Sequence, residues 1–399
     1  MKLIALHHRL AGFSSHHVNE ALGLIEETAR RGWELDLPVS TWAPDGVLDY
    51  LAPFARRAFS DPTFDFSRTF EQRVDEFVRQ LREHVEPALT SNTRVMVTIA
   101  TQCETCALAR WASALPPKRV PQVFILYLSD RWNRAGARPD EPAEIAAAGR
   151  ELARLPHAVR ERFTLCATTA QLASELAVRM GTDVRRVPAH LNYRGLAAIA
   201  WARLARPVPT YPTIGFTGGA RREKGSHRWA DIVAACRSRA PMRFVVQAHD
   251  EGLEAGDFER LRALRACADV TLIDGPADRE VWESTLAAID VTVLPYERIN
   301  YRQRNSGIFA ESIAAGIPGV APSGTWLADQ ITARAAAGVV YEGDTPDAVA
   351  DAVARCVAEL GRYTSEAAAL ATAWRHSQSL AACLDAMAQP AGGAARAAP

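Results

Sequence analysis

One stretch, residues 289–327, constrains the fold of this 399-residue chain more than any other. It begins with an apolar, β-branched run at 289–294, which is typical of a buried strand. A polar loop follows, with Arg302 and Arg304 in residues 301–305, and then a helical segment, 308–315, which Gly316 and Pro318 bring to an end. A strand, a loop and a helix in this order are the repeating unit of an α/β domain with a parallel sheet.

Ser306 and Gly307 stand where this helix begins. The first N–H groups of a helix have no partners inside the helix, and together with the helix dipole they form a site for an anion. Gly307 would let a phosphate approach the backbone. Glu311 lies about one turn further along the same face, where its carboxylate would accept hydrogen bonds from a ribose diol. A phosphate site followed by a diol site predicts that this segment binds a nucleotide-sugar.

The run SGIFAESIAAGIP, residues 306–318, resembles the donor-binding signature of the retaining GT-B glycosyltransferases (group 1, family 4-like). In that family a strand and a polar loop precede a small residue, Gly, and Glu-Ala-hydrophobic-Ala-x-Gly-x-Pro. The resemblance is strong over 213–330 and extends to 1–190 only in topology. It implies an α/β fold with two Rossmann-like domains facing each other across a cleft, and a C-terminal helix that crosses back to the first domain. The alternative interpretation is the generic strand–loop–helix unit of any α/β domain.

Length and composition agree with two domains, because 399 residues exceed what one core usually serves. Lys+Arg and Asp+Glu both number 46, so bulk charge would not attract a nucleic acid. No apolar run approaches the roughly 20 residues that span a bilayer, and MKLIALHHRL is too short for a signal peptide. Seven scattered cysteines favour reduced thiols in a cytoplasmic protein. We interpret the CxxC formed by Cys103 and Cys106 as packing residues.

Alternating strand and helix patterns, interrupted by prolines near residue 210, suggest where the domains end. Residues 41–87, with aromatic loops and a helix, are interpreted as an insertion that would set acceptor specificity. The tail is rich in Ala, Gly and Pro, which is typical of disorder. The expected parts are an acceptor-binding Rossmann-like domain (1–190), a linker (191–212), a donor-binding Rossmann-like domain (213–360), a helix packing back on the first domain (361–388) and a disordered tail (389–399).

A second segment, FTGGARREKG, resembles the phosphate-clamping loop of the same family, in which an arginine and a lysine flank the diphosphate. Lys224 stands at the place of the lysine. The usual arginine position, directly after the first glycine, Gly218, is Gly219 here. Arg221 or Arg222 would then supply the charge, since an arginine can bind phosphate through two hydrogen bonds. The other interpretation of these residues is a solvated basic turn.

The first glutamate of the family's pair, eight positions before Glu311, is replaced by Gln303. A glutamine can bond to sugar hydroxyls but cannot carry charge, so we interpret it as altered sugar recognition, with lost activity as the alternative.

In the first domain the position where the family usually has a histidine is Ser129. With Lys224, Arg221, Arg222 and Gln303 as catalytic candidates, the other candidates are Gly12, Gly218, Gly219, His249, Gly275, Pro276, Asn305, Ser306, Gly307, Ile308 and Glu311 on the donor side, and His16, His17, Ser129 and Asp130 on the acceptor side.

The resemblance implies transfer of a sugar from a UDP- or GDP-linked donor to a hydroxyl of a carbohydrate, lipid or small-molecule acceptor, with retention of anomeric configuration. The β-phosphate of the donor would act as the base, without a metal ion or another cofactor. Consistently, the sequence has no evident set of residues with metal-ligand spacing. Bacterial polysaccharide, glycolipid or natural-product glycosylation would be the setting. Peripheral membrane contact and the oligomeric state stay open.

Two alternatives remain at this point. One is a nucleotide-sugar epimerase or hydrolase of the same architecture, which would recruit His16, His17 and Asp130. The other is a sugar-nucleotide-binding protein without activity, which the departures from the family pattern would explain. Release of a changed sugar in the absence of an acceptor would distinguish the first, and binding without turnover the second.

Overall fold

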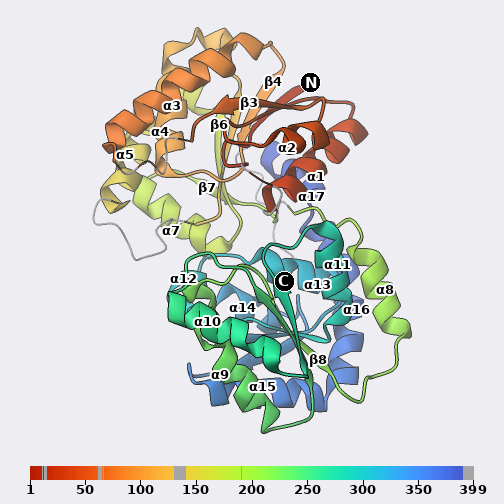
Figure 1. The fold of residues 1–399 in the computed structure, drawn as a ribbon. Coiled ribbons are helices and arrows are strands. Elements are labelled where there is room, and N and C mark those ends of the chain that lie inside the picture. The colour runs from red at the N-terminus through yellow and green to blue at the C-terminus, as the bar shows by residue number, and fades with distance from the viewer. Residues whose placement is uncertain are drawn as a thin grey trace. The chain divides into compact units, whose positions relative to one another are not determined.

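The computed structural model describes residues 1–10, 12, 16–61, 65, 67–129, 141–189 and 191–389, without the side chains of His16 and Glu141. The chain divides into two compact units (Figure 1). Unit 1 contains Met1–Asn192 together with the segment that starts at Gln378, and unit 2 contains Tyr193–Ser377. Each unit is built around its own parallel sheet.

Unit 1 has a seven-stranded sheet with the order β3-β2-β1-β4-β5-β6-β7, and every neighbouring pair is parallel. Leu3 of β1 lies opposite Leu35 of β2 on one side and Arg94 of β4 on the other. The strand order reverses at β1 and β4, which is the Rossmann arrangement. The strands are β1 (Lys2–Leu6), β2 (Glu34–Ser40), β3 (Ala55–Phe59), β4 (Thr93–Val97), β5 (Gln122–Tyr127), β6 (Phe163–Ala167) and β7 (Val184–Arg186).

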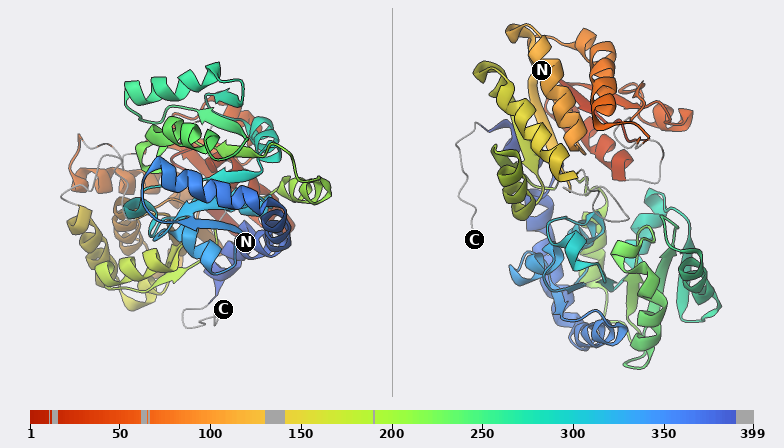
Figure 2. Two further views of the ribbon diagram at one scale, coloured as in Figure 1. Left: turned by 90° about the horizontal axis from the view of Figure 1, so that it is seen from below. Right: turned by 90° about the vertical axis from the view of Figure 1, so that its left-hand side faces the viewer.

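Helices cover both faces of this sheet, as two views show (Figures 1 and 2). Successive residues of β1 alternate between the two hydrophobic cores, because side chains of a strand point to opposite faces. One core lies under α1 (His16–Arg30), α2 (Asp45–Tyr50) and α17 (Leu380–Ala388). The other lies under α3 (Phe70–His84), α4 (Gln102–Ala114), α5 (Glu141–Arg154) and α7 (Ala170–Met180). The shorter helices are α6 (His157–Arg160), η2 (Glu86–Ala88) and η3 (Pro117–Arg119).

Unit 2 repeats this plan with a six-stranded parallel sheet in the order β10-β9-β8-β11-β12-β13. The order reverses between β8 and β11, where Ile214 lies opposite Val291. In such sheets ligands bind outside the carboxyl ends of the strands at this reversal. The strands are β8 (Thr213–Phe216), β9 (Arg243–Ala248), β10 (Val270–Asp274), β11 (Val291–Val293), β12 (Gly319–Pro322) and β13 (Gly338–Tyr341).

The helices of unit 2 also form two layers. One layer contains α8 (Leu196–Ala205), α11 (Arg279–Ala288), α13 (Gly307–Ala314) and α16 (Leu360–Ser377). The other contains α9 (Trp229–Arg237), α10 (Ala255–Ala263) and α15 (Pro346–Ala358), which pack on the sheet through a core that includes Trp229 and Phe244. The remaining elements are α12 (Arg298–Tyr301), α14 (Trp326–Thr332), η4 (Arg222–Lys224), η5 (Ser226–Arg228) and η6 (Leu264–Ala266).

Residues 41–87 are part of the Rossmann unit and not an insertion. They contain β3, which extends the sheet by pairing with β2, and α3, whose apolar side enters the core. Two features of the sequence hide these strands. Pro38 interrupts β2, and Arg56 and Arg57 give β3 a charged appearance.

The structural division differs from the expected one at two further places. The segment interpreted as a linker contains α8, which packs on α16 and α11 and belongs to unit 2. Helix α16 also belongs to unit 2, so only α17 of the segment 361–388 packs in unit 1, against α1. Apart from Gln389, the expected tail lies outside the described residues.

All seven cysteines are free thiols. Cys103 and Cys106 lie on α4 and are buried in the core of unit 1, which agrees with a packing role. Burial raises the pKa of Cys106 to about 12, so this thiol is not activated as a nucleophile.

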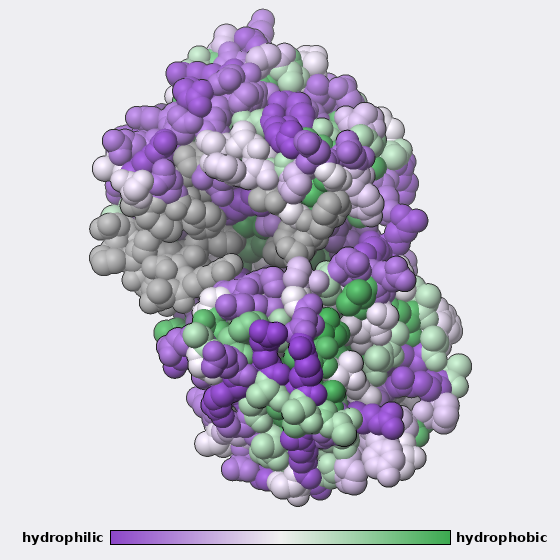
Figure 3. Space-filling view, in the orientation of Figure 1, coloured by the Kyte–Doolittle hydropathy of each residue, from purple (hydrophilic) through white to green (hydrophobic). Residues whose placement is uncertain are grey.

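Hydrophilic residues occupy much of the face shown in Figure 3, with smaller hydrophobic areas between them. Among the described residues, no helix has both the length and the apolar character needed to cross a bilayer.

Candidate functional site

The candidate site is built from two loops at the strand reversal of unit 2. Strand β8 ends at Phe216 and leads into the loop that carries Gly218 and Lys224, while β11 leads through α12 to the start of α13. Because β8 and β11 are neighbours and parallel, both loops leave the sheet at the same edge. The two segments that the sequence singles out therefore meet.

Gly218 is the point of contact between them. A Cβ atom at this position would overlap Cδ1 of Ile308 and would come within 3.0 Å of the Lys224 Nζ. Its φ of +95° is also a conformation that favours glycine. Gly218 therefore lies against both the ammonium group of Lys224 and the first turn of α13.

A side chain of the sheet fixes this loop. The N–H of Gly218 donates to Oε1 of Gln247 at 2.8 Å, and Nε2 of Gln247 donates to the carbonyl of Gly275 at 3.1 Å. Gln247 comes from β9, so it ties the loop after β8 to the loop after β10. This role could not be predicted, because a glutamine inside a buried strand has no motif around it.

Lys224 is a buried cation, with 6 % of its surface exposed. Burial first, and the charge of Arg221 next, lower its pKa to about 7, and Arg304 acts in the same direction. The following residue, Gly225, has a φ of +72°, and a Cβ there would overlap the carbonyl oxygen of Pro295. The turn thus favours glycine directly after Lys224.

Of the two candidate arginines, Arg221 lies in this cluster. Its Nε is 3.2 Å from Oε2 of Glu251 and 3.4 Å from Oε1 of Glu223. Arg222 instead has an exposed side chain, 3.9 Å from Glu254. A Cβ at Gly219, the position of the family's arginine, would overlap the carboxyl group of Glu251, so this acid occupies the space in front of Gly219.

Glu251 is a residue that the sequence interpretation missed. It follows the expected Ala248–His249 turn after β9, and its Oε1 is 3.5 Å from Nε2 of His249. An acidic residue just after a strand end was the available signal. His249 is partly exposed, Gly275 holds the loop after β10 through its N–H bond to Ala248, and Pro276 is exposed.

Helix α13 begins at the residues that the sequence analysis places at the start of a helix. Ser306 is the N-cap, and its hydroxyl accepts the N–H of Phe309 at 3.2 Å. Gly307 begins the helix, and a Cβ there would meet nothing within 4 Å, so the space in front of the backbone is open. The N–H groups of Gly307 and Ile308 belong to the first turn, for which a helix supplies no acceptor. Asn305, just before the cap, is partly buried.

Glu311 lies one turn further on and accepts a hydrogen bond from Nε1 of Trp282 at 3.0 Å. Glu311 is partly buried, and burial raises its pKa to about 7 in spite of this bond. Trp282 comes from α11 and was not expected to take part. Gln303 is buried, with 3 % of its surface exposed, in the loop before α13.

The remaining candidates belong to unit 1. Gly12 is partly buried in the loop after β1, and His17 is partly buried in the first turn of α1. Ser129 is buried just after β5. His16 begins α1, but its side chain, like the whole of Asp130, lies outside the described residues.

No protein-family model matches the sequence, and no curated protein sequence matches it significantly. Solved structures do match the fold. Sucrose-phosphate synthase from Thermosynechococcus elongatus aligns with a TM-score of 0.64 and 16% identity over 96% of each chain. HepE of Anabaena in complex with UDP-glucose aligns with a TM-score of 0.64 and 12% identity, over 97% of this chain and 98% of that chain. WaaG, a glycosyltransferase involved in lipopolysaccharide biosynthesis, aligns with a TM-score of 0.62 and 13% identity, over 98% of this chain and 100% of that chain. The chain thus has the expected GT-B fold with two Rossmann-like domains.

Proposed function

We propose that this chain is a glycosyltransferase that moves a sugar from a nucleotide-diphosphate-sugar, most directly a UDP-sugar, to an acceptor hydroxyl. One observation carries the proposal: Gly218 lies against both the Lys224 ammonium and Ile308 in the first turn of α13. A buried cation and a helix N-terminus that share one glycine form a site for a diphosphate. The likeness in fold to HepE, which was solved with UDP-glucose, supports a UDP-linked donor.

Charge is the physical basis of the proposal. The positive charges of Arg221 and Arg304 help to lower the pKa of Lys224, and the negative charge of a bound diphosphate would favour the protonated lysine. As the bond to the sugar breaks, more negative charge develops on the departing diphosphate. Fixed cations in a poorly hydrated site stabilise that charge more strongly than they stabilise the bound donor.

Glu311 and Gln303 are assigned to the two ends of the donor. The Glu311 carboxylate, oriented by Trp282, is proposed to accept hydrogen bonds from the ribose diol. Gln303 is proposed to contact hydroxyls of the transferred sugar, since a buried amide both donates and accepts. Arg221, and not the exposed Arg222, is assigned the role of the family's arginine.

In the proposed step, the bond between the anomeric carbon and the β-phosphate oxygen breaks, and the acceptor oxygen bonds to the same face of that carbon. The acceptor's proton passes to the departing β-phosphate oxygen, so retention needs no protein base. No metal ion or other cofactor is assigned to this step. A carbohydrate, lipid or small-molecule acceptor is proposed, with His17 and Ser129 of unit 1 as candidate contacts.

The first test combines donor binding and turnover. We expect UDP and at least one UDP-sugar to raise the melting temperature of the wild-type protein, because ligands that bind only the folded state stabilise it. Lys224→Ala should weaken UDP binding by more than about tenfold, since it removes a buried charge-assisted contact. Glu311→Ala should also weaken it. Calorimetric titration with UDP and donor turnover in the presence of an acceptor panel are the measurements.

The matched control is Lys118→Ala, which removes an exposed lysine of η3. It should bind UDP like the wild type. Near-normal binding and turnover by both site variants would remove the site assignment. Free UDP with a changed sugar in the absence of any acceptor would favour an epimerase or hydrolase, and binding without turnover would favour a protein that only binds sugar nucleotides.

A further inference from the structure

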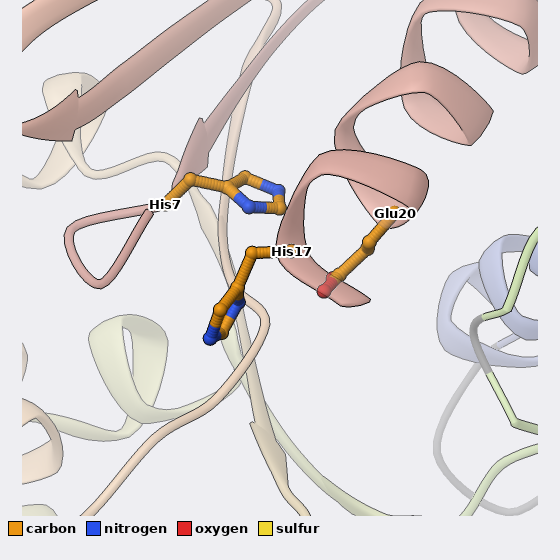
Figure 4. Close-up of side chains that lie close together, drawn as sticks. All are labelled: His7, His17 and Glu20. Atoms are coloured by element: carbon orange, nitrogen blue, oxygen red, sulfur yellow. The ribbon is translucent and has the colours of Figure 1, made fainter. Parts of the chain in front are cut away.

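A separate cluster of polar side chains lies at the strand reversal of unit 1. His7 follows the last residue of β1, and His17 and Glu20 lie in the first turns of α1 (Figure 4). The backbone of His7 is held in register with β2, because its N–H donates to the Pro38 carbonyl at 2.9 Å and it forms a bridge with Val39. His17 and Glu20 are three residues apart, so they share one face of the helix. The strand end and the helix therefore present three metal-binding side chains to one another.

The three side chains converge on a small volume. One ligand atom from each of His7, His17 and Glu20 lies within 4.8 Å of the other two. His7 is 2 % exposed and Glu20 is 1 % exposed, while His17 is partly exposed. In tetrahedral zinc sites the ligand atoms are about 3.3 Å apart, which follows from bonds of about 2.0–2.1 Å. To bind one tetrahedral ion, the three atoms would have to approach one another by up to about 1.5 Å.

His8 and Glu104 form a second group near the same strand end, and in this group the carboxylate already has several hydrogen-bond partners. Nε2 of His8 is 2.8 Å from Oε1 of Glu104, but the same oxygen accepts Nη2 of Arg9 at 2.6 Å. The other oxygen of Glu104 accepts the N–H of Thr101 at 2.9 Å. The guanidinium already neutralises this carboxylate, so His8 and Glu104 form a buried ion cluster and not a metal site.

We propose that His7, His17 and Glu20 bind one divalent transition-metal ion, with Zn²⁺ as the preferred ion. Two imidazoles and one carboxylate suit zinc and related borderline ions, and they are poor ligands for Mg²⁺ or Ca²⁺, which prefer oxygen alone. Three protein ligands leave one coordination position for water or for an oxygen atom of a bound molecule. The ion would also join the end of β1 to the start of α1.

This site uses none of the donor-cluster residues of unit 2, and it gives His17 a different role from that of an acceptor contact. The inference does not rest on the proposed sugar transfer. It also differs from the expectation that the chain holds no metal. The sequence does not reveal the site because His7 is ten residues before His17 and belongs to a different element. A histidine three residues before a glutamate on a helix is too common to predict a metal.

The test uses the full chain, freed of metal with a chelator and titrated with Co²⁺, whose visible absorption reports its coordination, and with Zn²⁺ in competition. We expect one equivalent of Co²⁺ to bind the wild type with the absorption of a four- or five-coordinate ion, and Zn²⁺ to displace it. His17→Ala and Glu20→Gln should weaken Co²⁺ binding by more than about tenfold, since even the loss of outer-shell partners costs 10–100-fold. Zn²⁺ should raise the melting temperature of the wild type and not of these variants.

The matched control is His157→Ala, which removes an imidazole with 74% of its side chain exposed and should leave Co²⁺ binding unchanged. Circular dichroism of the metal-free variants establishes that they fold. His17 is the less buried position, so His17→Ala decides the question if Glu20→Gln does not fold. Substoichiometric binding by the wild type, or equal binding by His17→Ala and His157→Ala, would overturn the proposal.

Discussion

Lys224 lies nearly buried beside Arg221 and Arg304, and burial together with these charges brings its pKa to about 7, far below the ordinary value of 10.5. Between these two pH values the unfolded chain binds more protons than the folded chain. The free energy of unfolding therefore rises with pH across this window, and the protonated lysine destabilises the ligand-free fold near and below pH 7. A bound diphosphate would reverse this shift by supplying opposite charge.

Proton uptake on UDP binding tests whether the nucleotide raises the pKa of Lys224. At about pH 8, where UDP is already fully ionised and Lys224 is largely neutral, we expect the wild type to take up close to one proton per UDP bound. Lys224→Arg stays protonated throughout and should bind UDP without uptake. Calorimetric titrations in buffers of different ionisation enthalpy give the number of protons. Equal uptake by both proteins would show that the proton goes elsewhere.

Glu311 behaves in the opposite sense. Its pKa of about 7 lies above the ordinary value of 4.5, so the folded chain binds more protons between these pH values. The free energy of unfolding thus falls as pH rises from 4.5 to 7. Burial therefore disfavours the charged forms of both Lys224 and Glu311 near neutral pH. This cost in stability fits a site that is arranged to bind a ligand.

The turn between η4 and η5 is the element on which the cation cluster depends. Gly225→Ala would place a Cβ against the Pro295 carbonyl at a φ of +72°, so we expect a clear fall in melting temperature, corresponding to about 1–3 kcal/mol. Gly256→Ala, near the start of α10, meets nothing within 4 Å and should be neutral or stabilising by up to about 1 kcal/mol. Scanning calorimetry of both variants checks this, and equal shifts would contradict it.

Elements with a strong local pattern could be predicted from the sequence. The strand 213–216 matches β8, and the helix expected at 308–315 is α13 displaced by one residue. Strands β2 and β3 could not be predicted, because a proline in β2 and two arginines in β3 obscure their short apolar patterns. Pairing with a neighbouring strand stabilises both of them. Local propensity cannot report that pairing.

The same limit applies to the candidate site. Lys224, Gly218 and Ser306 could be found because each belongs to a short motif with its own spacing. Gln247 and Trp282 could not, since they reach the site from β9 and α11 and have no motif. Their roles arise only when the parallel sheet brings several strand ends to one edge.

For the whole molecule, the two units should respond differently to the nucleotide. We expect UDP to slow amide hydrogen exchange most in unit 2, at residues 216–225, 247–251 and 303–311, because these segments carry the candidate contacts. Lys224→Ala, at the same UDP concentration, should show little of this protection. Greater protection in unit 1 than in these segments would contradict the assignment of the donor to unit 2.

Unit 1 is completed by a part of the chain that comes after unit 2. Leu380, Cys383, Leu384 and Met387 of α17 enter the core beneath α1. A ribosome makes residues 1–192 first, yet it releases these four side chains only after the whole of Tyr193–Ser377 has been synthesised. During translation the apolar surface of unit 1 that α17 covers therefore stays exposed until α17 is made. We expect a chaperone to bind this surface.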